Sequence, residues 1–389
     1  MQKIHRDIID LIKVAITGEN VIINDSLDIE SIIEIAIKHQ ILPCIAEGLY
    51  QSKNFSNANI KDMLWKSILR DQNQLYELMQ IEKSFEQQGI DYILLKGSSL
   101  KELYPKSEFR LMGDIDILIK EAQYDKIKTI MRDLGFEEGK ETDHELIWLK
   151  KPFTYIELHK KLIPSYNDDY YSYFSDCWSR AIQVASTHRY AMPHEDEYIF
   201  LFTHLAKHYR DGGIGLRHLI DFWMIQKKYP NLDYKYINRE LKKISLKIFH
   251  DNIISTLKVW FSHADSNELT DHITERVIES GSYGIKEKCN AANAARVSNR
   301  ADNVSVASRK EALKLIFLPF SHMKIKYPIL KKIPILLPIM WVVRWLEAIF
   351  LKRKNMQEAY NRWMSITEET VLSYNQELER VGLMFDLKK

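Results

Sequence analysis

The chain has 389 residues, more than one typical domain, and this length favours two or three domains. Hydrophobic residues at 46% and charged residues at 28% are those of a soluble globular protein with ample chain to bury a core. The formal net charge of only +2 excludes a strong overall field that would recruit nucleic acid or an acidic membrane. Cys44, Cys177 and Cys289 form no CxxC pair, so their spacing argues against a disulfide framework or a zinc site and favours a reducing, cytoplasmic location.

The first 88 residues predict a helical lead-in. Met1–Gly18 has apolar residues at roughly helical spacing, and charged residues interrupt it where a secretory signal would be uninterrupted. A second helix begins after Asp28, and Pro43 starts a third. Lys61–Gln88 carries an apolar stripe along one long helix. We expect these helices to pack on the domain that follows.

A strand, a turn and a helix come next. The apolar run Tyr92–Leu95 is short enough to be a buried strand. Lys96–Ser99 (KGSS) predicts a tight turn, and Leu100–Tyr104 then begins a helix that the following proline ends. The Gly97-Ser98 turn offers backbone N–H groups and the positive end of a helix dipole to phosphate. Lys96 is either a phosphate contact or a surface charge.

The segment Asp114–Ile119 predicts a second strand with two acids on one face. Its alternation places Asp114 and Asp116 on one side and Ile115 and Ile117 on the other. Two carboxylates on one strand face repel each other and lose solvation, so the pattern indicates a bound divalent cation. Replacing Asp116 with Asn should then leave the metal-free protein folded or slightly more stable. The alternative is that both aspartates only cap turns.

A third strand, Tyr155–His159, adds Glu157 and His159 on a single face. If this strand lies beside Asp114–Ile119, Glu157 joins the two aspartates around one point. Three carboxylates can hold two hard cations, Mg²⁺ or Mn²⁺, about 4 Å apart, an arrangement that clamps an in-line phosphoryl displacement. His159 is then a candidate second partner or general base. Otherwise Glu157 is a solvated strand residue.

The elements around these strands predict the fold class and the domains. Glu121–Leu134 indicates a helix, Thr142–Lys150 a further strand, and together they make a small mixed sheet backed by helices. From Tyr170 onward the chain shows long helical runs without clear strands, and we place a boundary near Pro164–Asp169. We therefore expect an α+β protein with a helical lead-in over 1–88, a mixed-sheet domain over 89–165 and a larger, mostly α-helical region over 166–389.

The motifs KGSSL, YP, DIDILI, LGF and IELH, with Arg110 just before DIDILI, resemble those of a bacterial group of uncharacterised nucleotidyltransferases. The order of strand, Gly-Ser turn, helix and Asp-x-Asp strand is similar to that of the superfamily that includes polymerase beta and the aminoglycoside nucleotidyltransferases. The resemblance is densest over about residues 85–165 and continues more loosely through HLAKHYRDGGIGLRHLIDF. It implies a nucleotidyltransferase palm at 89–165.

In such enzymes a helical domain behind the palm closes over base, ribose or acceptor. By that analogy, Lys207, His208, Arg217 and Asp221 are candidate nucleotide-binding residues, together with the turn at Lys96, Gly97 and Ser98. Arg110 either neutralises the triphosphate or forms an ion pair with one of the two strand aspartates.

Two later segments allow alternatives. Residues 281–309 are the most polar run, typical of a mobile linker or of a lid that orders when nucleotide binds. Residues 329–351 are strongly apolar, but their longest uninterrupted span is 11 residues, too short to cross a bilayer. We expect either a buried helix or an interfacial helix that contacts a membrane surface weakly through 329–354.

These observations predict an enzyme that moves a nucleoside monophosphate from an NTP such as ATP to the hydroxyl of a small molecule or biosynthetic intermediate. Asp114, Asp116 and Glu157 are its candidate catalytic and metal-binding residues, and pyrophosphate leaves. No basic stripe marks a duplex channel, so a nucleic-acid template is not expected. The alternatives are an inactive nucleotide-binding or scaffold protein, which the intact acids disfavour, and a membrane-surface enzyme with a lipid-linked acceptor.

Overall fold

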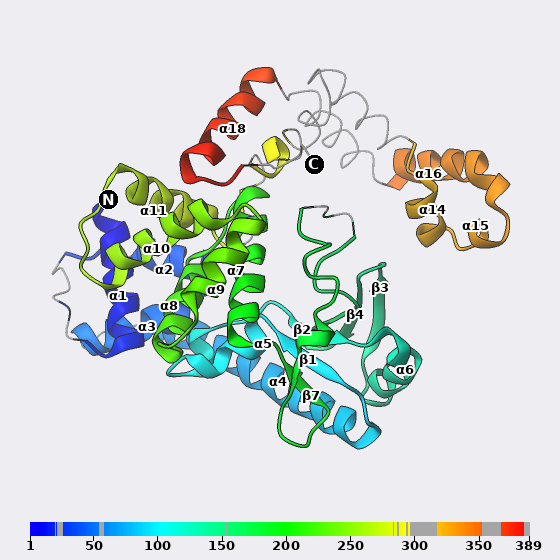
Figure 1. The fold of residues 1–389 in the computed structure, drawn as a ribbon, viewed down its shortest axis with the longest axis horizontal. Helices are drawn as coiled ribbons and strands as arrows, with labels where there is room; N and C mark the ends of the chain where they lie inside the picture. The colour runs from blue at the N-terminus through cyan, green and yellow to red at the C-terminus, as the bar shows by residue number, and fades with distance from the viewer. Residues whose placement is uncertain are drawn as a thin grey trace. The chain divides into compact units, whose positions relative to one another are not determined.

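The structure of the protein is a computed structural model of the whole chain, and Figure 1 shows its ribbon. Two compact units divide the chain: residues 1–209 with 213–283 form the first, and residues 210–212 with 284–389 form the second. Among the described residues, no helix is both long enough and apolar enough to cross a membrane. The structure describes residues 1–19, 21, 26–53, 58–152, 154–165, 167, 169–282, 284–285, 288–292, 295, 317–351 and 367–384.

The first unit begins with four helices: α1 (Lys3–Thr17), α2 (Ile29–Lys38), α3 (Leu42–Lys53) and α4 (Ala58–Gln88). The Asp28 carboxylate accepts a hydrogen bond from the backbone N–H of Ser31, which satisfies a donor at the start of α2. Helices α1 and α3 approach so closely that a Cβ at Gly48 would lie 2.3 Å from the carbonyl oxygen of Leu11. The predicted helical start of the chain is confirmed.

The centre of the first unit is one sheet of seven strands: β1 (Tyr92–Leu95), β2 (Ile115–Ile119), β3 (Glu137–Glu141), β4 (Glu145–Lys150), β5 (Thr154–His159), β6 (Ile182–Gln183) and β7 (Arg189–Ala191). Their order is β3-β4-β5-β2-β1-β7-β6. Strand β2 is antiparallel to β1 and parallel to β5, while β7 is parallel to β1. The sheet is therefore mixed, as the α+β prediction requires.

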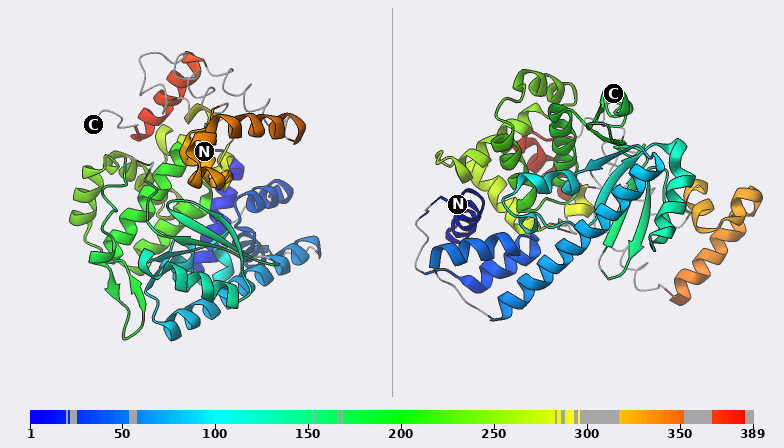
Figure 2. Two further views of the ribbon diagram at one scale, coloured as in Figure 1. Left: turned by 90° about the vertical axis from the view of Figure 1, so that its right-hand side faces the viewer. Right: turned by 90° about the horizontal axis from the view of Figure 1, so that it is seen from below.

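One face of this sheet is covered by α4 and by α6 (Tyr124–Asp133), and α4 can be followed along the sheet in Figure 2. Phe85 of α4 and Met131 of α6 belong to the same buried apolar cluster as Ile117 and Ile156 of the strands. Because side chains alternate along a strand, Asp116 of β2 and Glu157 and His159 of β5 point away from this cluster. The core thus fixes which face carries the acids.

Further helices complete the described part of both units. In the first unit they are α7 (His194–Arg210), α8 (Leu216–Lys228), α9 (Tyr234–Lys243), α10 (Lys247–Phe261) and α11 (Glu268–Ser280); in the second they are α14 (Phe320–Lys326), α15 (Ile329–Lys332), α16 (Leu337–Leu351) and α18 (Glu368–Val381). Most of the polar run 281–309 lies outside the described residues, so its prediction as linker or lid stays a prediction.

Two details differ from the expected secondary structure. The region after Tyr170 is mostly helical, as predicted, but the short strands β6 and β7 extend the sheet beyond β1. These strands have only two and three residues, too few to show an alternating pattern. The helix after the turn also begins earlier, as α5 (Gly97–Leu100), and continues only as the 3-10 turn Lys101–Leu103. The backbone N–H of Leu100 already donates to the carbonyl oxygen of Lys96.

Candidate active site

The predicted acids lie together on the neighbouring strands β2 and β5 and at the start of β2. Asp116 pairs in register with Glu157, and Leu118 pairs with His159, as expected if the two strands are neighbours. Asp114 lies directly before the first residue of β2, so it belongs to the entry of the strand rather than to its interior. The parallel pairing therefore brings residues 41 positions apart in sequence onto one face of the sheet.

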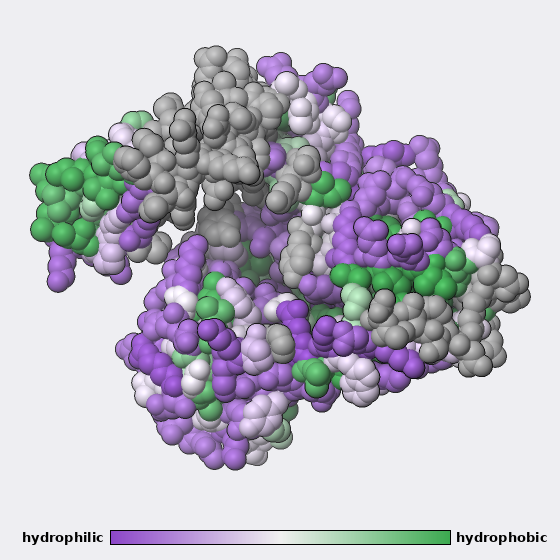
Figure 3. Space-filling model, turned by 180° about the vertical axis from the view of Figure 1, so that it is seen from behind, coloured by the Kyte–Doolittle hydropathy of each residue, from purple (hydrophilic) through white to green (hydrophobic). Residues whose placement is uncertain are grey.

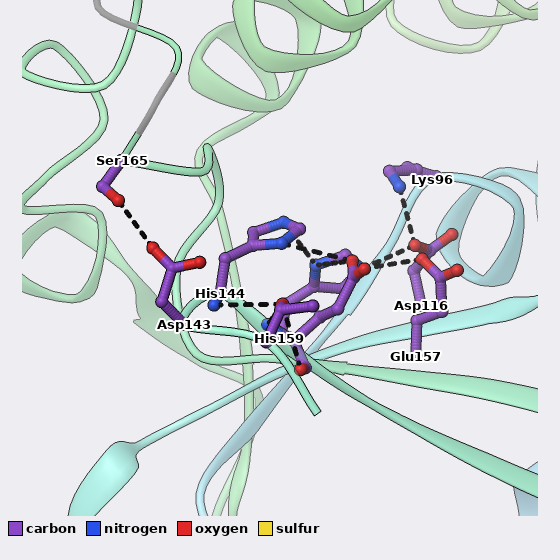
Figure 4. Close-up of polar contacts among 9 residues, drawn as sticks. Lys96, Asp116, Asp143, His144, Glu157, His159 and Ser165 are labelled. Atoms are coloured by element: carbon purple, nitrogen blue, oxygen red, sulfur yellow. Dashed lines mark hydrogen bonds and ion pairs between the residues drawn. The ribbon is translucent and has the colours of Figure 1, made fainter. Parts of the chain in front are cut away.

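Asp116 is the most deeply neutralised of these acids. Its Oδ1 lies 2.7 Å from Nζ of Lys96 and 2.7 Å from Nε2 of His159, and its side chain is 3% exposed (Figure 4). Burial opposes ionisation of this carboxyl, but the Lys96 ammonium and the His159 imidazole more than offset it. They hold the pKa of Asp116 well below its usual value. Asp116 is thus a carboxylate at neutral pH.

In contrast to Asp116, Glu157 and Asp114 have pKa values above their usual ones. Burial, with the nearby negative charges of Asp116 and Asp114, raises the pKa of Glu157 to about 8. Burial and the charge of Asp116 also raise the pKa of Asp114, although the Lys96 ammonium acts in the other direction. These two carboxyls therefore lack the counter-charge that a bound cation would supply.

From the sequence we expected the repulsion between the site carboxylates to act mainly on Asp116. We expected the Asn substitution at Asp116 to leave the metal-free protein folded or slightly more stable, whereas the lowered pKa of Asp116 indicates that the fold favours its ionised form. Repulsion falls on Glu157 instead. The reason is that Lys96 and His159 both contact the same oxygen of Asp116, and neither contact follows from the spacing of the acids alone.

The acids face a cavity of about 330 Å³ whose other wall comes from α7, α8 and the segments before them. Lys96, Gly97, Arg110, Lys207, His208, Arg217 and Asp221 all line it, together with the three acids and His159. Ser98 is not among its lining residues. The Ser98 side chain is buried, and its hydroxyl donates to Sδ of Met112 at 3.9 Å.

The turn before α5 is shaped by a close approach of its backbone to Met112. Lys96 has a φ of 50°, in the left-handed region, which directs the following residues into the helical turn. A Cβ at Gly97 would lie 2.8 Å from Cγ of Met112 and 3.0 Å from its Sδ. Gly97 therefore lets the chain pass close to Met112 while its own backbone lines the cavity.

Arg110 and Asp221 contact each other. The guanidinium donates from Nε to Oδ1 of Asp221 at 2.7 Å and from the terminal nitrogen Nη2 to Oδ2 at 2.8 Å. The hydroxyl of Tyr104 donates to the same carboxylate at 2.6 Å. The sequence left Arg110 to pair with one of the strand aspartates or with triphosphate, and the structure gives it this partner on α8. The pair ties α8 to the palm.

The remaining predicted residues lie on the helical wall. Arg217 donates to the carbonyl oxygen of Leu111 at 3.2 Å and to the side chain of Gln40, which holds its guanidinium at the cavity. Burial lowers the pKa of His208 to about 3, with the Lys207 ammonium acting in the same direction, so this imidazole is neutral. The wall therefore combines cationic groups with neutral imidazoles.

Sequence reasoning missed one cavity residue that contacts His159, His144, which directly precedes Glu145 at the start of β4. Nδ1 of His159 lies 3.3 Å from Nε2 of His144, and Nδ1 of His144 lies 3.2 Å from Oε2 of Glu145. The signal was present in TDHELIWLK, because an antiparallel partner of IELH places Glu145 opposite His159. This signal could be used only once the pairing of this strand with IELH was known.

The donor set fits a divalent cation. Asp116, Glu157 and His159 each offer a ligand atom, and these atoms lie within 4.8 Å of one another. Burial and the neighbouring carboxylates raise the pKa values of two of the cavity's carboxyls, and hard cations prefer such oxygen donors.

The mixed sheet thus presents paired carboxylates to a cavity that cationic side chains also line. Residues 25–262 match the family of uncharacterised nucleotidyltransferases, and because this span exceeds half of the chain, the chain belongs to that family. Among solved structures, the antibiotic-resistance factor ANT(2'')-Ia is similar at 11% identity and a TM-score of 0.34, over 50% of this chain and 100% of that one. No protein of curated function matches the chain.

The raised pKa of Glu157 predicts a pH-dependent stability. Between its usual value of 4.5 and about 8 the folded protein holds a proton that the unfolded chain has lost, so this residue makes the metal-free protein less stable as pH rises. Glu157→Gln removes the cost. At pH 8 with a chelator present, urea unfolding should show the variant about 1–3 kcal/mol more stable than the parent, and the gain should vanish below pH 4.5.

The exposed Glu137→Gln serves as the matched control and should stay within about 0.5 kcal/mol of the parent at every pH. A Glu157→Gln protein that is less stable than the parent at pH 8 would contradict the assignment of repulsion to this carboxyl.

The pair between α8 and the palm gives a second prediction. Asp221→Asn leaves the guanidinium of Arg110, 7% exposed, without its counter-charge, so we expect a loss of about 3–5 kcal/mol in the free energy of unfolding. The double variant Arg110→Met with Asp221→Leu removes both charges and should recover most of that loss. Denaturant melts of the three proteins provide the measurement. Equal stability of Asp221→Asn and the parent would show that the pair does not tie the elements together.

Proposed function

We propose that this protein transfers a nucleoside monophosphate from an NTP to a hydroxyl of a small molecule or biosynthetic intermediate and releases pyrophosphate. The observation that carries the proposal is the register pairing of Asp116 with Glu157, with Asp114 at the entry of the same strand, on the floor of a cavity that cationic side chains also line. Membership of a nucleotidyltransferase family supports the general reaction.

Asp114, Asp116 and Glu157 would hold the divalent ions, Mg²⁺ or Mn²⁺, that this chemistry requires. When bound, such ions lower the pKa of an acceptor hydroxyl and neutralise negative charge on a triphosphate. The raised pKa values of Glu157 and Asp114 support this assignment, because both carboxyls would ionise fully beside a cation.

The chain's own residues would bind and orient the nucleotide. In the metal-free protein Lys96 neutralises Asp116, and a cation on that carboxylate would leave the ammonium available to a phosphate in the same cavity. Lys207 and Arg217 supply positive charge from the helical wall. His159 fixes the orientation of Asp116 through its Nε2–H donor, and the pair of Arg110 and Asp221 fixes the distance of α8 from the palm.

This proposal predicts different outcomes for two acids. Glu157→Gln should bind Mg²⁺ and NTP within several-fold of the parent yet lose about 3–4 kcal/mol of transition-state stabilisation. The reason is that the Glu157 carboxylate would complete the metal centre rather than hold the nucleotide. Asp116→Asn should lose Mg²⁺-dependent NTP binding itself. Incubation with each α-labelled NTP and a metabolite extract measures product, and calorimetry measures binding.

The exposed Glu121→Gln is the control for surface charge and should retain the parent rate. Parental turnover by Glu157→Gln would remove Glu157 from the centre. An NTP-binding protein that yields no labelled product with any extract would favour the alternative of a nucleotide-binding scaffold.

The second unit favours one addition, contact with an anionic membrane surface near a lipid-linked acceptor. Ile335, Ile339, Val342 and Leu346 follow one another at helical spacing, and all are exposed, Ile335 by 84%. The aromatic side chains of this region pack on one another instead. The ring centroids of Trp341 and Trp345 lie 5.3 and 5.2 Å from that of Phe317. The exposed apolar surface is visible at the left edge of Figure 3.

The charged residues around this apolar face indicate what kind of surface it contacts. Residues 317–349 contain five Lys or Arg and one Glu, and exposed Lys331 and Lys332 border the apolar face. Aliphatic side chains bordered by lysines match the boundary between headgroups and acyl chains of an anionic bilayer. We therefore propose that α15 and α16 lie on such a surface, which is the interfacial one of the two alternatives that the sequence left for residues 329–354.

Flotation with vesicles tests this contact. The full chain should float with vesicles that contain an anionic phospholipid and not with purely zwitterionic ones, and Ile335→Ser with Ile339→Ser should abolish flotation. Leu372→Ser on α18, equally exposed at 59%, is the matched control and should float like the parent. A parent protein that stays unbound to anionic vesicles, or that dimerises through this face instead, would overturn the membrane proposal.

A further inference from the structure

A chain of four polar side chains leads from the acidic centre to the start of β4 (Figure 4). Oδ1 of Asp116 lies 2.7 Å from Nε2 of His159, Nδ1 of His159 lies 3.3 Å from Nε2 of His144, and Nδ1 of His144 lies 3.2 Å from Oε2 of Glu145. The backbone fixes this series, because β2 pairs with β5 and Glu145 of β4 pairs opposite His159.

These contacts place ligand atoms around one point. The facing nitrogens, Nδ1 of His159 and Nε2 of His144, lie 3.3 Å apart, and Oε2 of Glu145 lies 4.0 Å from Nδ1 of His159. Imidazole nitrogens and carboxylate oxygens are both ligands of zinc-class ions.

The surroundings of this point favour a cation. The Asp116 carboxylate lies 2.7 Å from the other ring nitrogen of His159, and Glu145 adds a second carboxyl 3.2 Å from His144. A metal ion binds imidazoles in their neutral form, and these carboxyls offset its charge.

The geometry matches a tetrahedral centre. Two nitrogen ligands at the usual zinc distance of 2.0–2.1 Å lie about 3.4 Å apart in a tetrahedron, close to the 3.3 Å between the facing imidazole nitrogens. His144, Glu145 and His159 also offer ligand atoms that all lie within 4.8 Å of one another. Nε2 of His159 is held by Asp116, an arrangement that orients a metal-binding imidazole and fixes its tautomer.

We propose that His144, His159 and Glu145 bind a transition-metal dication of the zinc class, at a site separate from the Asp114, Asp116 and Glu157 centre. Imidazole nitrogens favour zinc, cobalt or nickel over magnesium, so the two sites would select different ions in the same cavity. The metal would fix the ring of His159 and, through it, the orientation of Asp116. This inference goes beyond nucleotidyl transfer, and its test needs no nucleotide.

Cobalt(II) provides the probe, because its visible absorption reports nitrogen ligands in a tetrahedral field. The full-length protein, stripped of metal and then saturated with Mg²⁺, should bind one equivalent of cobalt with an intense visible band that zinc displaces. His144→Ala should lose the band and weaken binding more than about 100-fold, and Glu145→Gln should weaken it at least about 10-fold.

Two variants serve as controls for this titration. His208→Ala removes a different buried imidazole of the same cavity, and Glu157→Gln removes a ligand of the proposed magnesium centre; both should retain the cobalt band. Circular dichroism shows whether each variant is folded, and Glu145→Gln keeps the test decisive if His144→Ala is not. Failure of the parent to bind cobalt, or parental binding by Glu145→Gln and His144→Ala, would overturn the inference.

Discussion

The site depends on the charge balance at one buried carboxylate. Oδ1 of Asp116 receives both the Lys96 ammonium and the His159 imidazole, and the three groups come from the end of β1, from β2 and from β5. Because all three are largely buried, removing any one leaves an uncompensated polar group in the interior. The same contact thus joins three neighbouring strands and keeps one acid ionised, while burial and the charge of that acid raise the pKa values of its neighbours.

This imbalance gives the acids distinct chemical characters despite their proximity. Asp116 is ionised in the metal-free protein, whereas burial and the charge of Asp116 raise the pKa values of Glu157 and Asp114. The helical wall adds fixed positive charge through Arg217 and keeps His208 neutral. A polar cavity with such a gradient suits a polyanionic substrate held between a cationic wall and an acidic floor.

Much of this arrangement could be predicted from the sequence, where local patterns were strong. The alternation in DIDILI and IELH fixed which side chains share a face, and the family motifs located the palm; the pairing of β2 with β5 follows that expectation. The partners of the acids could not be predicted, since Lys96 reaches Asp116 only because of the left-handed backbone at the turn. Likewise, the pair of Arg110 with Asp221 joins residues 111 positions apart, a distance over which periodicity carries no information.

The position of β7 has a consequence for the order in which the chain can fold. The backbone N–H of Tyr92 donates to the carbonyl oxygen of His188, and β7 then pairs alongside β1. A nascent chain that has emerged only as far as residue 165 would leave one side of β1 as an open edge, available to another strand. Completion of the sheet has to wait for residues 189–191 and carries the entropy of a long loop. A shortened version that stops after β5 would contain all three acids but would lack the strands that cover the free side of β1.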